Sequence, residues 1–157
     1  MRTRPRNRAF TLVEILIVVV ILGILAAIIT PAMANASDSG KQATFVQSVR
    51  VFADAIELYR AKTGSFPPDG SSGTLAAPLA NGYIDPDDFN NGTPIGGVWD
   101  NETNESGVVC AVGVHFNGDP VPSNEFLVDL DASFDDGNLA TGRFRSLTAD
   151  RFYLIIE

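Results

Sequence analysis

An acidic segment near the C-terminus carries the side chains best suited to bind a metal ion. The run DLDASFDDGN contains five oxygen-bearing side chains, Asp129, Asp131, Asp135, Asp136 and Asn138. Calcium binds six to eight oxygen atoms from carboxylates, amides and backbone carbonyls, so this segment can supply several ligands. The alternative is a solvated turn with Asp136 and Gly137 at its tip. The sequence leaves both interpretations open, and we predict calcium as the ion if the segment binds one.

The other reactive side chains form no catalytic or zinc-binding pattern in the sequence. The chain has one histidine, His115, and one cysteine, Cys110, both in an apolar stretch typical of a strand. A single cysteine excludes an internal disulfide, and one histidine with one cysteine excludes a zinc site of ordinary composition. We expect His115 to be structural or at the surface and Cys110 to be a small core residue. The sequence therefore predicts a protein that is not an enzyme.

A single acid, Glu14, interrupts the most apolar part of the chain. Residues 15–29 are fifteen consecutive apolar positions, and counting back to Phe10 gives twenty positions interrupted only by Thr11 and Glu14. A helix of about twenty residues spans the hydrocarbon thickness of a bilayer, about 30 Å. An ionised carboxylate there is costly unless a partner neutralises it. Cutting the chain before Phe10 creates an α-amino group that can pair with Glu14 of the same or a neighbouring subunit.

Four arginines and no acid precede the apolar stretch, at positions 2, 4, 6 and 8. This bias favours an N-terminus in the cytoplasm and a C-terminal side outside it. An ordinary secretory signal peptide, cut after Ala34 or Ala36, and a plain signal anchor also fit the pattern. Neither explains the acid near the start of the apolar stretch, because signal peptides seldom carry one there.

The segment RAFTLVEILIVVVILGILAAIITP resembles the N-terminal signal segment of type IV pilins and type II secretion pseudopilins. The resemblance implies that a prepilin peptidase removes residues 1–9, cutting between Ala9 and Phe10, and that Phe10 is then N-methylated. It also implies that Glu14 assists assembly. The family usually has Gly before the cut, where this chain has Ala9.

The same resemblance implies partners and a location. The partners are further copies of the chain in a homopolymeric or mixed filament, the prepilin peptidase and an inner-membrane assembly platform. The location is the inner membrane, crossed once, with the C-terminal domain outside the cytoplasm. The run YRAKTGSFPP is similar to the end of the long helix in major pseudopilins, which favours a secretion pseudopilin over a pilus subunit. A secreted or membrane-tethered binding module is the alternative.

The charge of the chain argues against nucleic acid as a partner. Without residues 1–9, which hold four arginines and no acid, seven basic and nineteen acidic side chains remain, a net charge of −12. An acidic exterior of this size repels the phosphate backbone of DNA.

A long helix is predicted to continue beyond the apolar stretch. An apolar stripe with spacings of four and three residues marks one helix face, and it consists of Phe45, Val49, Phe52, Ile56 and Tyr59. Lys62, Gly64 and Pro67 indicate where the helix ends. Gly23 and Pro31 weaken helical structure, the first by its low propensity and the second by its missing N–H, so a bend is expected between them.

The remainder of the chain predicts a small sheet. Residues 65–107 are rich in Gly, Pro, Asn and Asp and predict an ordered but irregular connection, in which Asp85, Asp87 and Asp88 cap a helix or turn and Trp99 is a packing residue. Strands are expected at 108–116, 126–130, near 144–147 and at 152–156. Three or four antiparallel strands on the stripe of one long helix give an α+β, pilin-like fold. The expected domains are a leader, 1–9, a transmembrane or filament-core helix, 10–31, and an extracytoplasmic domain, 32–157.

Overall fold

The computed structural model describes residues 10–104 and 107–156, apart from the side chains of residues 31, 32, 34 and 35. The chain divides into two compact units, Met1–Ser39 and Gly40–Glu157. The elements, in chain order, are α1 (Leu12–Thr63), α2 (Pro86–Asn90), β1 (Val98–Thr103), β2 (Cys110–His115), α3 (Asn124–Ala132), β3 (Phe144–Thr148) and β4 (Arg151–Ile155).

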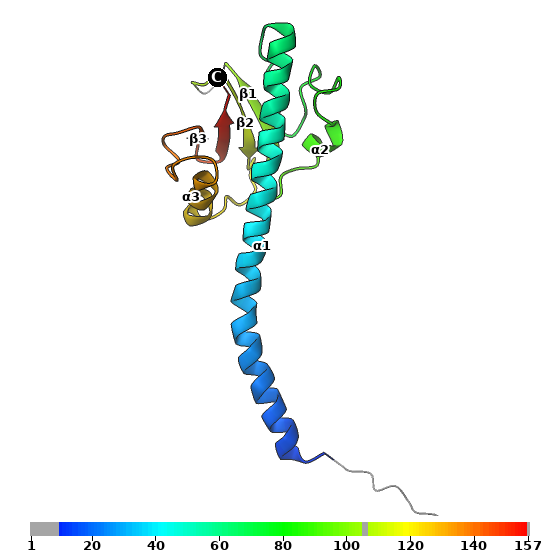
Figure 1. Ribbon diagram of the computed structural model, residues 1–157, viewed down its shortest axis with the longest axis vertical. Helices are drawn as coiled ribbons and strands as arrows, with labels where there is room; N and C mark the ends of the chain where they lie inside the picture. Colours follow the sequence, from blue (N-terminus) through cyan, green and yellow to red (C-terminus); the bar gives the residue numbers. More distant parts are fainter. Residues whose placement is uncertain (1–9, 105–106, 157) are drawn as a thin grey trace, which may run out of the picture. The chain divides into compact units, whose positions relative to one another are not determined.

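The four strands form one antiparallel sheet in the order β1-β2-β4-β3. In its register Trp99 pairs with Val114, and Val112 pairs with Leu154. Figure 1 shows the part of α1 that belongs to the second unit with α2 on one side and with α3 and β3 on the other. The predicted α+β fold with a long N-terminal helix and a small antiparallel sheet is therefore confirmed.

The stripe predicted on the long helix is the centre of the core of the second unit. Phe45, Val49, Phe52 and Ile56 are all buried. The ring of Phe45 stacks on that of Trp99 with the centroids 5.1 Å apart, and the ring of Phe52 meets the same indole edge-on at 5.0 Å. Aromatic pairs of this kind contribute about 0.5–1.5 kcal/mol each beyond their buried area. Trp99 is thus a packing residue, as predicted, and joins β1 to α1.

The helix α1 ends where the sequence indicates. Gly64 follows the last helical residue with a φ of +81°, and its N–H donates to the carbonyl of Arg60 at 2.8 Å. Glycine adopts this left-handed conformation without the steric penalty that other residues meet. At its other end α1 runs through Gly23 and Pro31 without a break in its helical assignment. That these two residues weaken the helix stays a prediction.

The strand predicted at 126–130 is wrong, because these residues lie in the helix α3. The prediction followed the alternation of Phe126, Val128 and Leu130, but the buried residues are Leu127, Leu130 and Asp131, which have helical spacing. The hydroxyl of Ser123 caps the helix by accepting a hydrogen bond from the N–H of Phe126 at 3.3 Å.

The segment 65–107, predicted as an ordered but irregular connection, contains two regular elements, the short helix α2 and the strand β1, and the strand was not predicted. Asp85 is the N-cap of α2, and its carboxylate accepts from the N–H of Asp87 at 3.0 Å, as the capping prediction expected. The buried ring of Phe89 holds α2 against α1, with its centroid 5.3 Å from that of Phe52. The strand β1 was missed because most of its residues are polar, although four of the six are buried.

Candidate functional site

The first candidate site is the start of α1. Thr11 precedes the helix, and its N–H and its hydroxyl both donate to Oε2 of Glu14 at 2.8 Å. In return, the N–H of Glu14 donates to the hydroxyl oxygen of Thr11 at 3.2 Å. This reciprocal pair is a capping box, which satisfies backbone groups that the first helical turn leaves without partners. Glu14 therefore has a hydrogen-bonding partner in its own chain, which the sequence analysis missed although Thr11-x-x-Glu14 is its usual signature.

Phe10 lies directly before this capping box and is 81% exposed. The α-amino group that would arise from a cut before Phe10 would thus be two residues from the helix start. Ala9, the other residue of the predicted cut, lies outside the described residues.

The side chains of the apolar part of α1 are exposed. Residues Leu12–Thr30 form a helix long and apolar enough to cross a membrane, and none of that span is buried within the protein. Ile24 is 58% exposed and Leu22 is equally so. Large exposed apolar surfaces of soluble monomers seldom exceed a few hundred Å², so this one requires lipid or other polypeptide chains around it.

The second candidate site is an acidic cluster at the C-terminal end of α3. Asp131, Asp135 and Asp136 each place a carboxylate oxygen within 4.8 Å of the other two. Of the five residues predicted as calcium ligands, these three come together. Asp129 is exposed on α3 and is not in the cluster. The amide oxygen of Asn138 accepts from the N–H of Ala140 at 3.2 Å.

Asp131 is the unusual member of this cluster. Its side chain is fully buried, and neither carboxylate oxygen makes a hydrogen bond of normal geometry among the described residues, although the backbone of Asn138 and the carboxylate of Asp135 lie close enough to affect its charge. Burial, together with the negative charge of Asp135, raises the pKa of Asp131 to about 6. An unpaired buried carboxylate is energetically costly, and a divalent cation beside it removes most of that cost.

Asp135 is held in place by the loop that follows. Its carboxylate accepts hydrogen bonds from the backbone N–H groups of Asp136, Arg143 and Phe144. Although burial opposes the change, these hydrogen bonds lower the pKa of Asp135. Gly142 lies against this carboxylate, and a Cβ atom there would overlap it. At neutral pH, therefore, two or three negative charges face one another, an arrangement suited to a hard divalent cation.

A third group of polar residues lies on the face of the sheet opposite α1, and the sequence analysis did not predict it. Asp100 and Glu102 are both 2% exposed. The hydroxyl of Tyr153 donates to Oδ2 of Asp100 at 2.8 Å, and the guanidinium of Arg151 pairs with Glu102. Burial and the charge of Asp100 raise the pKa of Tyr153, so its hydroxyl remains a donor. These residues come from strands about fifty positions apart, and pairing makes their burial tolerable.

Ser72, His115 and Asp150 extend this group toward the surface. The hydroxyl of Ser72 lies 2.8 Å from Nδ1 of His115, and Nε2 of the same ring lies 3.2 Å from Oδ2 of Asp150. These are the residue types of a hydrolytic triad, which sequence spacing did not indicate. However, the Ser72 hydroxyl also lies 2.9 Å from Oδ2 of Asp100, so its proton has a carboxylate acceptor. These contacts connect the 70–74 loop to the sheet, and the structural role of His115 stays a prediction.

Comparison with known proteins bears on the first of these three sites. Residues 4–30 match the family described as the prokaryotic N-terminal methylation motif. The matched segment contains Phe10, the Thr11–Glu14 capping box and nearly all of the exposed apolar span. Together with the long helix and the four-stranded antiparallel sheet, this match makes the chain similar to type IV pilin-like proteins.

Within that class, the chain is similar to type II secretion system core protein G. It is 36% identical to the protein of Pseudomonas aeruginosa over 64 residues, which are 41% of this chain and 45% of that one. It is 30% identical to the Klebsiella pneumoniae protein over 77 residues, or 48% and 55% of the two chains, and 28% identical to the Escherichia coli protein over 67 residues, or 43% and 46%. The chain thus spans about half the length of the curated relatives it matches. No solved structure matches it.

Proposed function

We propose that this chain is a pseudopilin, a structural subunit of a type II secretion filament. A prepilin peptidase cuts between Ala9 and Phe10 and methylates the new amine, and the processed chain polymerises through its N-terminal helix. One observation carries the proposal: the segment that matches the methylation motif is an apolar helix that no other described residue buries, and it begins at the Thr11–Glu14 capping box. The similarity to core protein G supports a secretion filament over a pilus.

In this mechanism Glu14 has two partners. Oε2 accepts both hydrogen bonds from Thr11 of its own chain, which fixes the rotamer of the carboxylate. The charge is then neutralised by the Phe10 amine of a neighbouring subunit. An ion pair between apolar helices is strong because water is excluded around it, and it sets the axial register of each incoming subunit. Residues 10–31 form the membrane anchor before assembly and the filament core afterwards.

The remaining assignments follow from the same mechanism. The chain crosses the inner membrane once, and residues 32–157 form the domain outside the cytoplasm. Its partners are further copies of itself, the prepilin peptidase and the inner-membrane assembly platform. The net charge of −12 on the processed chain argues against nucleic acid as a partner.

Two measurements test this proposal. Mass spectrometry of the membrane-extracted chain is expected to find an N-methylated Phe10 at the N-terminus. In cells that hold a type II secretion apparatus, Glu14→Ala is expected to leave processing intact and to reduce filament yield at least tenfold, with Asp38→Ala as a control acid outside the apolar span. A mature chain that starts at Asn35 or Ser37 would contradict the proposal and support a secreted or tethered binding module. Undiminished filaments of the Glu14 variant would refute the role of the ion pair.

We further propose that Asp131, Asp135 and Asp136 hold calcium, with backbone carbonyls completing the oxygen shell. The unpaired burial of Asp131 supports this proposal, because a solvated acidic turn would leave its carboxylates in water. Calcium at one hundred times its dissociation constant should stabilise the fold by about 2.7 kcal/mol. Thermal melts with calcium and with chelator should therefore differ, and the difference should vanish in Asp131→Asn but not in Asp129→Asn. Equal midpoints for the unaltered chain would exclude the site.

A further inference from the structure

Three arginines of the second unit have no ion-pair partner among the described residues, although the unit is strongly acidic. Residues 40–157 contain seven basic and seventeen acidic side chains. Nevertheless, in the part of the chain that the structure describes, Arg50, Arg143 and Arg145 have no carboxylate within ion-pair distance. Arg50 instead donates to the carbonyl of Ser133 at 2.9 Å, and the Nε atom of Arg145 is buried without a hydrogen-bond partner.

These arginines line one groove, which we call the arginine groove. It consists of two adjoining hollows of about 280 and 320 Å³ between α1 and the edge formed by β3 and the ends of α3 and β4. Arg143 and Glu57 line both hollows, Arg50 and Arg145 line one each, and Phe134 forms part of the wall. Asp54 and Glu57 are the carboxylates among the lining residues, so three positive charges face two negative ones. Counted over its lining residues the groove is net positive, on a strongly negative domain, and the carboxylate of Asp135 lies beside it at the backbone N–H of Arg143.

A groove of this kind selects an anionic occupant. A guanidinium binds a carboxylate or phosphate through two parallel N–H donors. Arg143 is exposed, and its guanidinium has no hydrogen bond or ion pair among the described residues. The electrostatic potential at the arginine groove is also more positive than on the rest of this acidic domain, which steers an approaching acidic surface to the groove.

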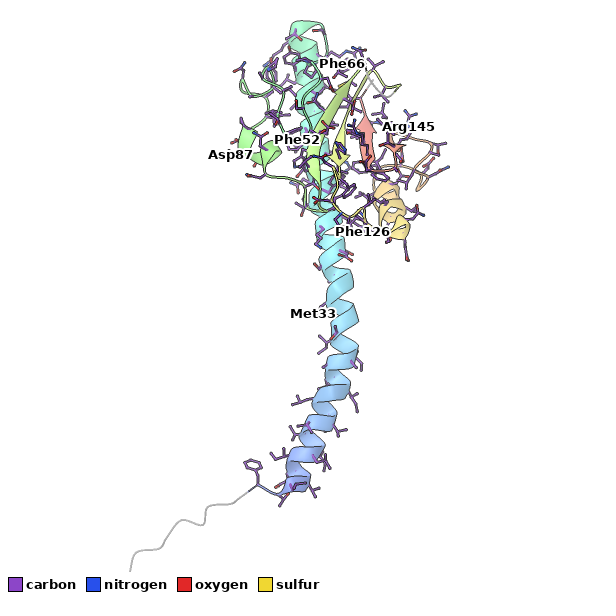
Figure 2. All side chains as sticks on the ribbon, turned by 180° about the vertical axis from the view of Figure 1, so that it is seen from behind. Met33, Phe52, Phe66, Asp87, Phe126 and Arg145 are labelled. Carbon is purple, nitrogen blue, oxygen red and sulfur yellow. The ribbon has the colours of Figure 1, made fainter. Side chains whose placement is uncertain are left out.

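The acidic segment around α2 has the complementary properties. Asp87 and Asp88 are exposed, and their carboxylates have no hydrogen bond or ion pair among the described residues. The segment is rigid, because Asp85 caps the helix and Phe89 is buried beneath it. Figure 2 shows Asp87 and Arg145 on opposite sides of α1, so the two surfaces of one subunit face different directions.

We propose that the arginine groove of one subunit binds the α2 acids, Asp87 and Asp88, of a second copy of this chain. Two different surfaces on opposite sides of a subunit make a head-to-tail contact, which repeats from copy to copy instead of closing into a dimer. This contact rests on the proposed filament function and adds to it a lateral contact between the domains outside the membrane. It gives the incoming subunit a rotational position that the apolar helices alone do not specify.

Charge exchange in the full-length chain tests this contact. In cells that hold the secretion apparatus, Arg143→Glu alone and Asp88→Lys alone are each expected to reduce filament yield at least fivefold. The double variant with both exchanges, or Arg143→Glu with Asp87→Lys, should recover to within about twofold of the unaltered chain. Arg143→Glu with Glu125→Lys is the matched control, because it restores the net charge of the chain by an exchange on α3, away from α2, and should not recover filament yield. Resistance to protease shows that each variant is folded.

Cross-linking gives a second readout. A cysteine at position 143 of one tagged copy and at position 88 of an untagged copy should be joined by a short bis-maleimide, whereas 143 with 125 should not. Native Cys110 is fully buried and does not compete for the reagent.

Each other outcome overturns the contact. Folded double variants that remain as poor as Arg143→Glu show that α2 is not the occupant. Full yield of Arg143→Glu shows that the groove makes no filament contact, and loss of its binding to phosphatidylglycerol vesicles in that case identifies a lipid phosphate as the occupant. Absence of filaments from the unaltered chain refutes the proposed function instead, and the cross-link in membranes then still decides whether the contact forms.

Discussion

Tyr153→Phe removes one oxygen atom from the interior and is therefore a sharp test of the polar group on the sheet. The side chain of Tyr153 is fully buried, and its hydroxyl donates to Asp100, which is 2% exposed. The substitution keeps the ring and its packing but leaves Ser72 as the remaining side-chain hydroxyl that donates to the Asp100 carboxylate among the described residues. A hydrogen bond to a charged group contributes about 1.5–3 kcal/mol, so the free energy of unfolding should fall by about 2 kcal/mol. For a unit of this size that corresponds to about 8 °C in Tm.

The assay is thermal and denaturant unfolding of the full chain in detergent, followed by circular dichroism in the near ultraviolet. Tyr59→Phe is the matched control, because Tyr59 is half-buried and makes a ring contact with Tyr83 at 5.3 Å. That control should change stability by less than about 0.5 kcal/mol. If both variants lose the same stability, or Tyr153→Phe loses none, the buried hydroxyl does not support the Asp100 carboxylate and our account of the sheet face is wrong.

The same residue predicts how stability depends on pH. Burial raises the pKa of Tyr153 well above its ordinary value, so the folded domain keeps this proton at a pH where the unfolded chain loses it. Above about pH 10 the unfolded state therefore binds fewer protons, and stability falls by up to about 1.4 kcal/mol per pH unit from this group. Tyr153→Phe should lack this contribution, so the stability difference between the two proteins should shrink as the pH rises from 10 to 11.

A substitution at Gly142 and a labelling reaction at Cys110 test other parts of the structure. Gly142→Ala should destabilise the fold by about 1–3 kcal/mol and weaken calcium binding, because Gly142 has a φ of +77° and a Cβ atom would overlap the Asp135 carboxylate. Gly107→Ala is the control for backbone strain alone, because Gly107 also has a positive φ but has open space around it. Burial raises the pKa of Cys110, so its thiol should react with iodoacetamide only when the domain unfolds, and fast alkylation of the folded chain would contradict the burial of β2.

The sequence was sufficient for features whose physical cause is local. The apolar span, the amphipathic stripe and the glycine at the end of α1 each depend on residues within one or two helical turns. For the same reason the capping role of Asp85 was predictable, since its partner Asp87 is two residues away. The Thr11–Glu14 capping box is local too and its sequence signature is present, but an acid in an apolar span indicates a need for an opposite charge, which a hydroxyl three positions away does not supply.

The features that were missed depend on partners far along the chain. The strand β1 contains Asp100 and Glu102, which predict a loop when they are considered alone, and they are tolerated inside because Tyr153 and Arg151 reach them from β4. The residues of α3 predict a strand because a short apolar run fits both the two-residue period of a strand and the 3.6-residue period of a helix. The helix forms because it buries the face that holds Leu127 and Leu130.

Buried acids in this domain differ in what surrounds them, and that difference separates structural from ligand-binding roles. Asp100 and Glu102 have donors from a tyrosine, a serine and an arginine, so each of these two carboxylates has at least one partner within the fold. Asp131 is buried to the same degree but has two further carboxylates beside it, and neither of its oxygens makes a hydrogen bond of normal geometry among the described residues. The free-energy cost of an unpaired buried charge is of the same order as the whole stability of a domain. A fold therefore seldom retains such a charge unless a ligand or a function compensates for it. The surroundings of Asp131, more than the number of acids in its loop, are therefore the reason to look for calcium there.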